Sequence, residues 1–150
     1  MKIKNVRTDE LSLDPAITEL NDRVGIAHIY TPSEYIDEIT EEALMRYLAV
    51  MPPIAVIQDG QTRVVARAES LMIARQRNVP RIPVLIVDGD SVAVYITAEL
   101  HAMLLRGCRQ EGIRAWRLTQ ALDVMGVDHG LPRSRRRLAA YLDVDRRHLK

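Results

Sequence analysis

The end of this 150-residue sequence gathers the side chains best suited to binding a polyanion. Basic or ionisable residues lie on both sides of the short segment Asp143-Val144-Asp145, and they are Arg133, Arg135, Arg136, Arg137, Arg146, Arg147, His148 and Lys150. Such cations neutralise phosphates and release the counterions that condense on a nucleic acid. The segment therefore predicts contact with duplex DNA.

The apolar residues of the same segment have the spacing of a helix-turn-helix. They fall on one face of a short helix, in the turn, and on the inner face of a second helix, in the order Leu138, Ala139, Leu142, Val144 and Leu149. In this motif the second helix enters the major groove. Asp143 stands where such turns usually carry glycine, although aspartate tolerates the left-handed backbone region better than most residues. A solvated basic helical hairpin is the alternative.

Lys150 lies about five residues into the second helix of this motif, which is too short to be stable alone. We therefore expect the sequence to be part of a longer chain.

The charge of the chain is divided unevenly between its two parts. The net charge is +1, but residues 1–100 carry −5 and residues 101–150 carry +6. An acidic first part would repel a nucleic acid, so polyanion contact is expected at the end of the chain only. This asymmetry supports the DNA-binding interpretation independently of the helix-turn-helix spacing.

Composition places the chain among globular proteins of the cytoplasm. A hydrophobic content of 47% allows a buried core, which must rest on aliphatic residues because Phe is absent. The single cysteine, Cys108, excludes an internal disulfide and fits a reducing compartment. The first residues have no apolar run typical of a signal peptide, and no segment is apolar enough for a membrane span. We expect a cytoplasmic protein with no membrane partner.

Local patterns predict mixed secondary structure before the basic segment. Residues 1–33 read as irregular, and a helix is expected over 33–50, capped by Ser33 and ended by Pro52 and Pro53. Asp59-Gly60 between two β-rich runs predicts a hairpin of strands 54–57 and 61–65. A helix over 67–78 and a strand over 82–87 follow.

Residues 91–97 are ambiguous because their β-branched side chains favour a strand. The same residues can begin the helix expected over 98–106, with Asp90 or Ser91 as its cap, and we favour the helix. A further helix is expected over 113–125, between Gly112 and the loop 126–132.

The succession of these segments resembles the N-terminal domain of the ParB/sulfiredoxin superfamily of chromosome- and plasmid-partition proteins. The resemblance is carried by Pro52-Pro53-Ile54-Ala55-Val56-Ile57-Gln58-Asp59-Gly60, by Val64-Val65-Ala66, and by Val79-Pro80-Arg81-Ile82-Pro83-Val84-Leu85-Ile86-Val87. It implies an α+β fold: a small ParB/sulfiredoxin-like sheet with helices in domain 1–97, then an α-helical DNA-binding region, 98–150, that holds the helix-turn-helix. It also implies a role in plasmid or chromosome partition or mobile-element regulation, with a homodimer and a partition ATPase as candidate partners.

One departure from the family bears on nucleotide binding. Partition proteins carry a Gly-Glu-Arg-Arg box at a helix start, which the resemblance links to cytidine triphosphate, but this chain has Arg67-Ala68-Glu69-Ser70 there. Arg67, Glu69 and Ser70 therefore form at most a weak nucleotide site, with a helix cap and a surface charge as the structural interpretation. We expect no resident cofactor and disfavour a nucleoside triphosphate with magnesium.

An enzyme on the same scaffold is the alternative function, namely a nucleotidase or nuclease acting in plasmid competition. No residue stands out as catalytic, and the histidines have no metal-ligand spacing. Cys108 lies far from the box, which argues against sulfiredoxin chemistry.

Overall fold

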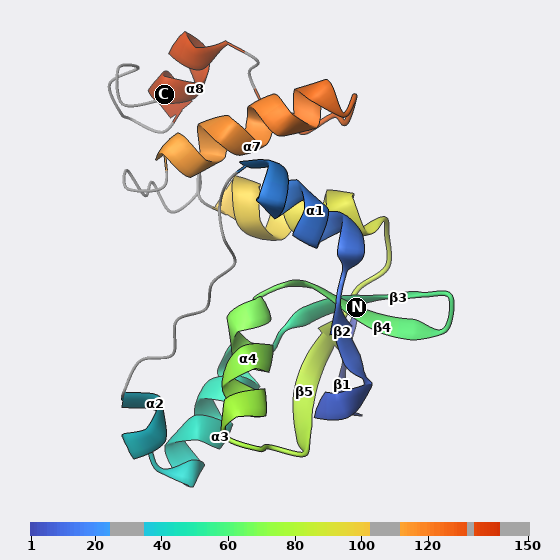
Figure 1. Ribbon diagram of the computed structural model, residues 1–150, viewed down its shortest axis with the longest axis vertical. Coiled ribbons are helices and arrows are strands. Elements are labelled where there is room, and N and C mark those ends of the chain that lie inside the picture. The colour runs from blue at the N-terminus through green and yellow to red at the C-terminus, as the bar shows by residue number, and fades with distance from the viewer. Residues whose placement is uncertain (25–34, 103–111, 132–133, 142–150) are drawn as a thin grey trace. The chain divides into compact units, whose positions relative to one another are not determined.

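The computed structural model describes residues 1–24, 35–102, 112–131 and 134–141. The chain forms two units, one made of Met1–Ile17 and Ile29–Val94, the other of Thr18–His28 and Tyr95–Lys150. The first holds a mixed sheet with helices and the second is helical where it is described (Figure 1). The predicted α+β class is confirmed.

The sheet of the first unit has the strand order β1-β5-β3-β4-β2. The strands are β1 (Lys2–Arg7), β2 (Leu11–Leu13), β3 (Ile54–Gln58), β4 (Gln61–Ala66) and β5 (Arg81–Ile86). β1 pairs with β5 and β3 with β4 in antiparallel fashion, whereas β3–β5 and β2–β4 are parallel. The predicted hairpin is confirmed, and both turn residues, Asp59 and Gly60, adopt positive φ angles of 53° and 73°.

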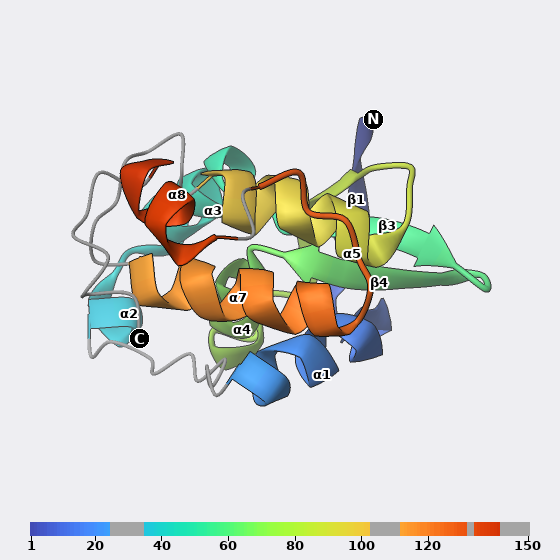
Figure 2. The same cartoon turned by 90° about the horizontal axis from the view of Figure 1, so that it is seen from above.

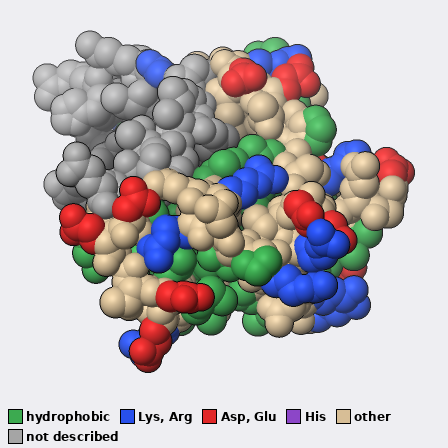
Figure 3. Space-filling view, turned by 60° about the horizontal axis from the view of Figure 1, so that its bottom comes forward, with side chains coloured by type: hydrophobic (Ala, Val, Ile, Leu, Met, Phe, Trp, Pro, Cys, Tyr) green, Lys and Arg blue, Asp and Glu red, His purple; other side chains and the backbone are tan. Residues whose placement is uncertain are grey.

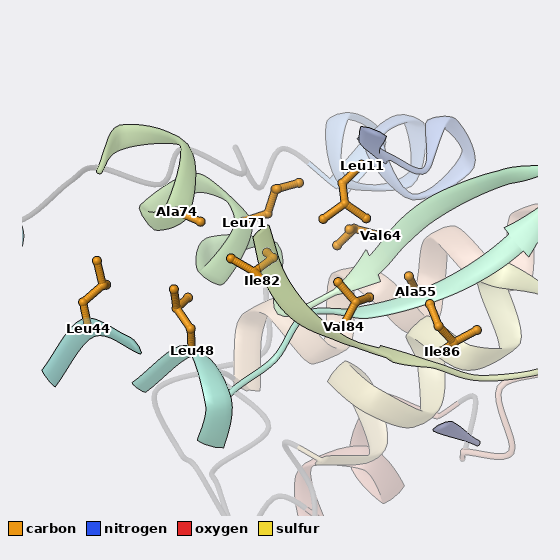
Figure 4. Close-up of a cluster of buried hydrophobic side chains, with 10 residues drawn as sticks. All are labelled: Leu11, Leu44, Leu48, Ala55, Val64, Leu71, Ala74, Ile82, Val84 and Ile86. Carbon is orange, nitrogen blue, oxygen red and sulfur yellow. The ribbon is translucent and has the colours of Figure 1, made fainter. Parts of the chain in front are cut away.

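The core of this unit lies between the sheet and helices α3 (Glu41–Val50) and α4 (Ala68–Gln76). Figure 4 shows the aliphatic side chains that fill it: Leu11, Leu44, Leu48, Ala55, Val64, Leu71, Ala74, Ile82, Val84 and Ile86. Strand β5 contributes every second residue to this cluster, and the helices contribute residues three or four positions apart. Each element thus buries one apolar face, and this burial stabilises the packing of the helices on the sheet. Within α4, Leu71 and Ala74 are fully buried in this cluster.

The prediction that residues 1–33 are irregular is wrong for the part that the structure describes. Besides β1 and β2, this segment holds the 3-10 helix η1 (Thr8–Glu10) and helix α1 (Pro15–Val24). β1 is exposed along almost its whole length, so it shows no alternation of apolar and polar residues. β2 has only three residues, and the strand with which it pairs, β4, is distant in the sequence. Asp14 caps the start of α1, where its Oδ1 accepts the Ala16 N–H at 2.9 Å.

The helix expected over 33–50 is interrupted, which corrects the prediction of a single element. Helix α2 (Tyr35–Glu38) ends and α3 begins at Glu41, because Thr40 adopts an extended conformation and its side chain accepts the Ala43 N–H at 3.2 Å. The expected cap Ser33 lies outside the described residues. Arg77 donates to the carbonyls of Ile36 and Ile39, at 2.5 and 2.9 Å, and so fixes the chain at this break.

Residues 91–97 are helical, as we favoured. Helix α5 (Ser91–Tyr95) starts with Asp90 Oδ2 accepting the Ala93 N–H at 3.1 Å, and it continues as the π-helical segment η2 (Ile96–His101). The Asp90 side chain favours the helix over a strand because it satisfies a backbone N–H of the first helical turn.

The second unit contains α7 (Gly112–Val124) and α8 (Arg135–Tyr141) in addition to η2 and residues 18–24 of α1. Figure 2 shows α7 with α8 and α1 on opposite sides of it. Buried apolar residues come from each of these helices and include Leu20, Leu100, Leu118, Leu122 and Leu138. A buried hydrogen bond of 3.1 Å from the Tyr95 hydroxyl to Asn21 Oδ1 joins the end of α5 to α1 within this unit.

Candidate nucleic-acid interface

Helix α8 is the first helix of the predicted helix-turn-helix, and Ser134 caps it. The Ser134 side chain accepts the Arg137 N–H at 3.4 Å, and its carbonyl accepts the Leu138 N–H at 2.9 Å. Serine is a preferred N-cap because its hydroxyl satisfies a donor of the first turn. The basic run therefore begins as a helix at its predicted place.

The two faces of α8 differ in chemistry. Leu138 is fully buried and Ala139 is 3% exposed, whereas Arg136 and Arg137 are exposed. The described turns of α8 thus present arginines to solvent while an apolar face holds the helix in place.

Of the other predicted DNA-contact residues, only Arg135 lies within the described part of the chain. Arg135 is the first residue of α8 by its backbone. The remaining predicted residues lie outside the described residues, namely Arg133, Arg146, Arg147, His148 and Lys150, as do Leu142, Val144 and Leu149. The second helix of the motif stays a prediction.

Helix α7 supports α8. Ala115, Leu118 and Leu122 recur at helical spacing and are fully buried, while Arg117 on the same helix is exposed. The helix ends at Val124. Gly126 follows with a φ of 71°, which favours glycine, and the Val127 N–H donates back to the Leu122 carbonyl at 2.9 Å. The predicted helix over 113–125 is confirmed within one residue at each end.

The loop after α7 contains a polar cluster that sequence reasoning missed. His129 is 3% exposed, and its Nε2 lies 3.0 Å from Asp123 Oδ1. Its Nδ1 accepts the Leu131 N–H at 3.1 Å, and its carbonyl lies 2.7 Å from His101 Nε2. Asp123 and His101 lie six and twenty-eight positions from His129 in the sequence, so no short sequence motif indicates this cluster.

The weak nucleotide site, Arg67–Ser70, lies at the start of α4, where its polar groups serve the fold. The buried Ser70 hydroxyl donates to the Met51 carbonyl at 2.7 Å, and Arg67 Nη1 lies 3.4 Å from the Pro52 carbonyl. Arg67 adopts the left-handed conformation, with φ 53° and ψ 43°, a region that favours glycine. Glu69 is exposed beside it. Sequence alone indicated the helix start but not these contacts.

Two exposed arginines of the first unit pair with nearby carboxylates. Arg7 pairs with Asp9 at 2.8 Å and Arg46 with Glu42 at 3.0 Å. Acidic and basic side chains are interspersed on the face of the molecule that Figure 3 shows. Mixed charge of this kind produces little attraction for a polyanion.

The described part of the chain shows neither a membrane-spanning helix nor a metal-binding cluster. None of its helices is long and apolar enough to cross a membrane. Within the same residues, no group of three or more His, Cys, Asp or Glu side chains is placed to hold a metal ion.

No protein-family model matches the chain, and no curated protein matches it. Among solved structures it is similar to the C-terminally truncated chromosome-partitioning protein ParB from Caulobacter crescentus complexed to the centromeric parS site, at 13% identity and a TM-score of 0.48, over 97% of this chain and 67% of that one. The same protein complexed with CTP-gamma-S matches at 12% identity and a TM-score of 0.40, over 99% of this chain and 75% of that one. At these identities the likeness concerns fold alone.

Proposed function

We propose that this chain is a ParB-type DNA-binding protein that holds the phosphates of duplex DNA with α8 and the residues after it. The observation that carries the proposal is the two-faced α8, with Leu138 buried and Arg136 and Arg137 exposed. A helix that is anchored on one side and basic on the other provides fixed cations for a phosphate backbone.

The distribution of charge supports the same proposal. Residues 101–150 carry +6, and residues 1–100 carry −5. A duplex would be repelled by the first part and attracted by the second, so the orientation of the complex would be set by long-range electrostatics before any base is read.

The proposed contact residues are Arg133, Arg135, Arg136, Arg137, Arg146, Arg147, His148 and Lys150. We further propose the division into a ParB/sulfiredoxin-like domain, 1–97, and a helical DNA-binding region, 98–150. In the cell the protein would act in plasmid or chromosome partition or in the regulation of a mobile element, as a homodimer in the cytoplasm.

A salt titration of duplex binding tests the proposal. The double variant Arg136→Ala, Arg137→Ala should bind DNA more weakly than the wild type, and the log–log salt slope should fall in magnitude by about 2, one unit for each lost phosphate contact. Fluorescence anisotropy at several salt concentrations measures both quantities.

The matched control is Arg46→Ala, Arg81→Ala, which removes the same charge from exposed positions of the first unit. Its slope should equal that of the wild type. Equal slopes in all three proteins, or absence of salt-dependent binding by the wild type, would show the proposal to be wrong.

A further inference from the structure

A hollow of about 380 Å³ opens on the first unit, between η1 and the segment that follows α4. Its volume lies at the lower end of the range for small-molecule pockets, about 300–1,000 Å³. The polar residues of its lining include two arginines, Arg7 and Arg75, one carboxylate, Asp9, and one amide, Asn78. The hollow therefore has the size and the chemistry for a small polar ligand.

Hydrogen bonds from Thr8 tie the two walls of this hollow to each other. The Thr8 N–H donates to the Pro80 carbonyl at 2.9 Å, and the buried Thr8 hydroxyl donates to the Val79 carbonyl at 2.5 Å. The Val79 N–H in turn donates to the Ala74 carbonyl at 2.9 Å, which joins the same wall to α4. The hollow is thus formed before a ligand binds, and a preformed site loses less conformational entropy on binding.

The charges at the hollow favour an anion. Its lining holds the two guanidinium groups of Arg7 and Arg75 against the single carboxylate of Asp9. In addition, the exposed Arg81 stands directly opposite Arg7 in the antiparallel pair of β1 and β5. Like charges at opposite positions destabilise a sheet, and one carboxylate does not balance them. An anionic ligand would supply the missing negative charge.

Both guanidinium groups of the lining keep donors for a ligand. A guanidinium carries several N–H groups in a planar fork. Within the described part of the chain, Arg7 uses Nη2 for Asp9 Oδ2, at 2.8 Å, and Arg75 uses Nη2 for the Leu11 carbonyl, at 2.7 Å. These contacts hold the two side chains in place and leave their other nitrogens for hydrogen bonds to an anion.

We propose that this hollow binds a small phosphate monoester that carries hydroxyl groups, a sugar phosphate by class. A phosphate monoester has three terminal oxygens, which match the three donor groups of Arg7, Arg75 and Asn78, whereas a carboxylate has two. The hydroxyls of the sugar would donate to Asp9. The same carboxylate disfavours a polyanion, such as a nucleic acid or a triphosphate. The inference does not rest on the proposed function.

Titration with ribose 5-phosphate, followed by backbone amide chemical shifts of the full chain, tests the inference. The amides of residues 7–9 and 75–79 should shift together. Inorganic phosphate and ribose should each bind more weakly, because each lacks one half of the contacts. Equal affinity for inorganic phosphate and ribose 5-phosphate would overturn the assignment to a sugar phosphate. The absence of shifts in both segments would overturn the site itself.

Variants locate the phosphate. Arg7→Gln should weaken binding about tenfold or more, since a charge-assisted hydrogen bond is lost. Asn78→Gly keeps the left-handed backbone, φ 54°, and removes only the amide, so binding should fall about fivefold.

The matched control is Arg46→Gln, because Arg46 is also exposed and paired with a carboxylate, at 3.0 Å. Its affinity for ribose 5-phosphate should equal that of the wild type. Unchanged binding in both Arg7→Gln and Asn78→Gly would overturn the inference. So would a loss in Arg67→Ala alone, which would place the phosphate at the start of α4 instead.

Discussion

Two helix starts in this chain carry arginine and serine, and they use these residues in opposite ways. At α4, Ser70 is buried and its hydroxyl donates to the Met51 carbonyl, while Arg67 turns towards the Pro52 carbonyl. At α8, Ser134 is exposed and caps its own helix, and Arg136 and Arg137 extend into solvent. Similar residue types thus hold a fold together in one region and present charge in the other.

The difference follows from what surrounds each helix. The start of α4 lies against the end of α3 and the Pro52-Pro53 segment, whose carbonyls need donors. In α8 the residues next to the arginines, Leu138 and Ala139, are the buried ones, so the arginines fall on the outer face. A helix start is therefore interpreted as a ligand site only after its own hydrogen bonds have been accounted for.

The largest expected effect comes from the buried face of α8. Leu138→Asp places a charge at a fully buried position and should lower the free energy of unfolding of the second unit by about 3 kcal/mol or more. Urea denaturation followed by circular dichroism measures it. The neighbouring Arg136→Asp, at an exposed position, should leave stability within about 0.5 kcal/mol. Equal stability of the two variants would mean that α8 does not pack on this face.

A smaller loss is expected at the start of α4. Ser70→Ala removes the donor to the Met51 carbonyl in a buried position and should cost about 1–3 kcal/mol of unfolding free energy. Ser12→Ala, at an exposed position of β2, is the matched control and should be nearly neutral. If the two substitutions cost the same, the Ser70 hydroxyl has no structural function.

Arg67→Gly should have a still smaller effect and the opposite sign. Glycine adopts the left-handed conformation of this position without a Cβ penalty, so the variant should gain up to about 1 kcal/mol in unfolding free energy. Asn78 also has a positive φ, 54°, but asparagine tolerates this region, so Asn78→Gly should gain less. A loss of stability in Arg67→Gly would show that the contact with the Pro52 carbonyl outweighs the backbone strain.

No effect is expected when cytidine triphosphate and magnesium are titrated into the protein. A triphosphate needs backbone amides and charge-assisted donors in place of its water, whereas here Glu69 adds a negative charge and the Ser70 hydroxyl is engaged. Isothermal titration calorimetry provides the measurement. Micromolar binding that is lost in Arg67→Ala would reverse the comparison of the two helix starts and favour the nucleotidase alternative.

Local sequence signals predicted the elements whose ends are fixed by neighbouring residues. Asp59-Gly60 set the hairpin because both residues take positive φ angles at little cost. Asp90 began the helix at Ser91, and the Leu138–Ala139 pair predicted which side of α8 is buried. In each case the cause lies within a few residues of the effect.

Tertiary structure decided the features whose partners are distant in sequence. β1 is exposed and polar and becomes a strand through its pairing with β5, while β2 has only three residues and depends on β4. The carbonyls that Arg77 holds, and the partners of His129, are brought together only by the fold. The sequence by itself determined the hairpin and the basic amphipathic helix, because capping, turn geometry and periodicity are local, whereas the α+β class was what the family resemblance implied. Strand order and the buried polar contacts required the folded chain, because a hydrogen bond between distant residues has no local signature.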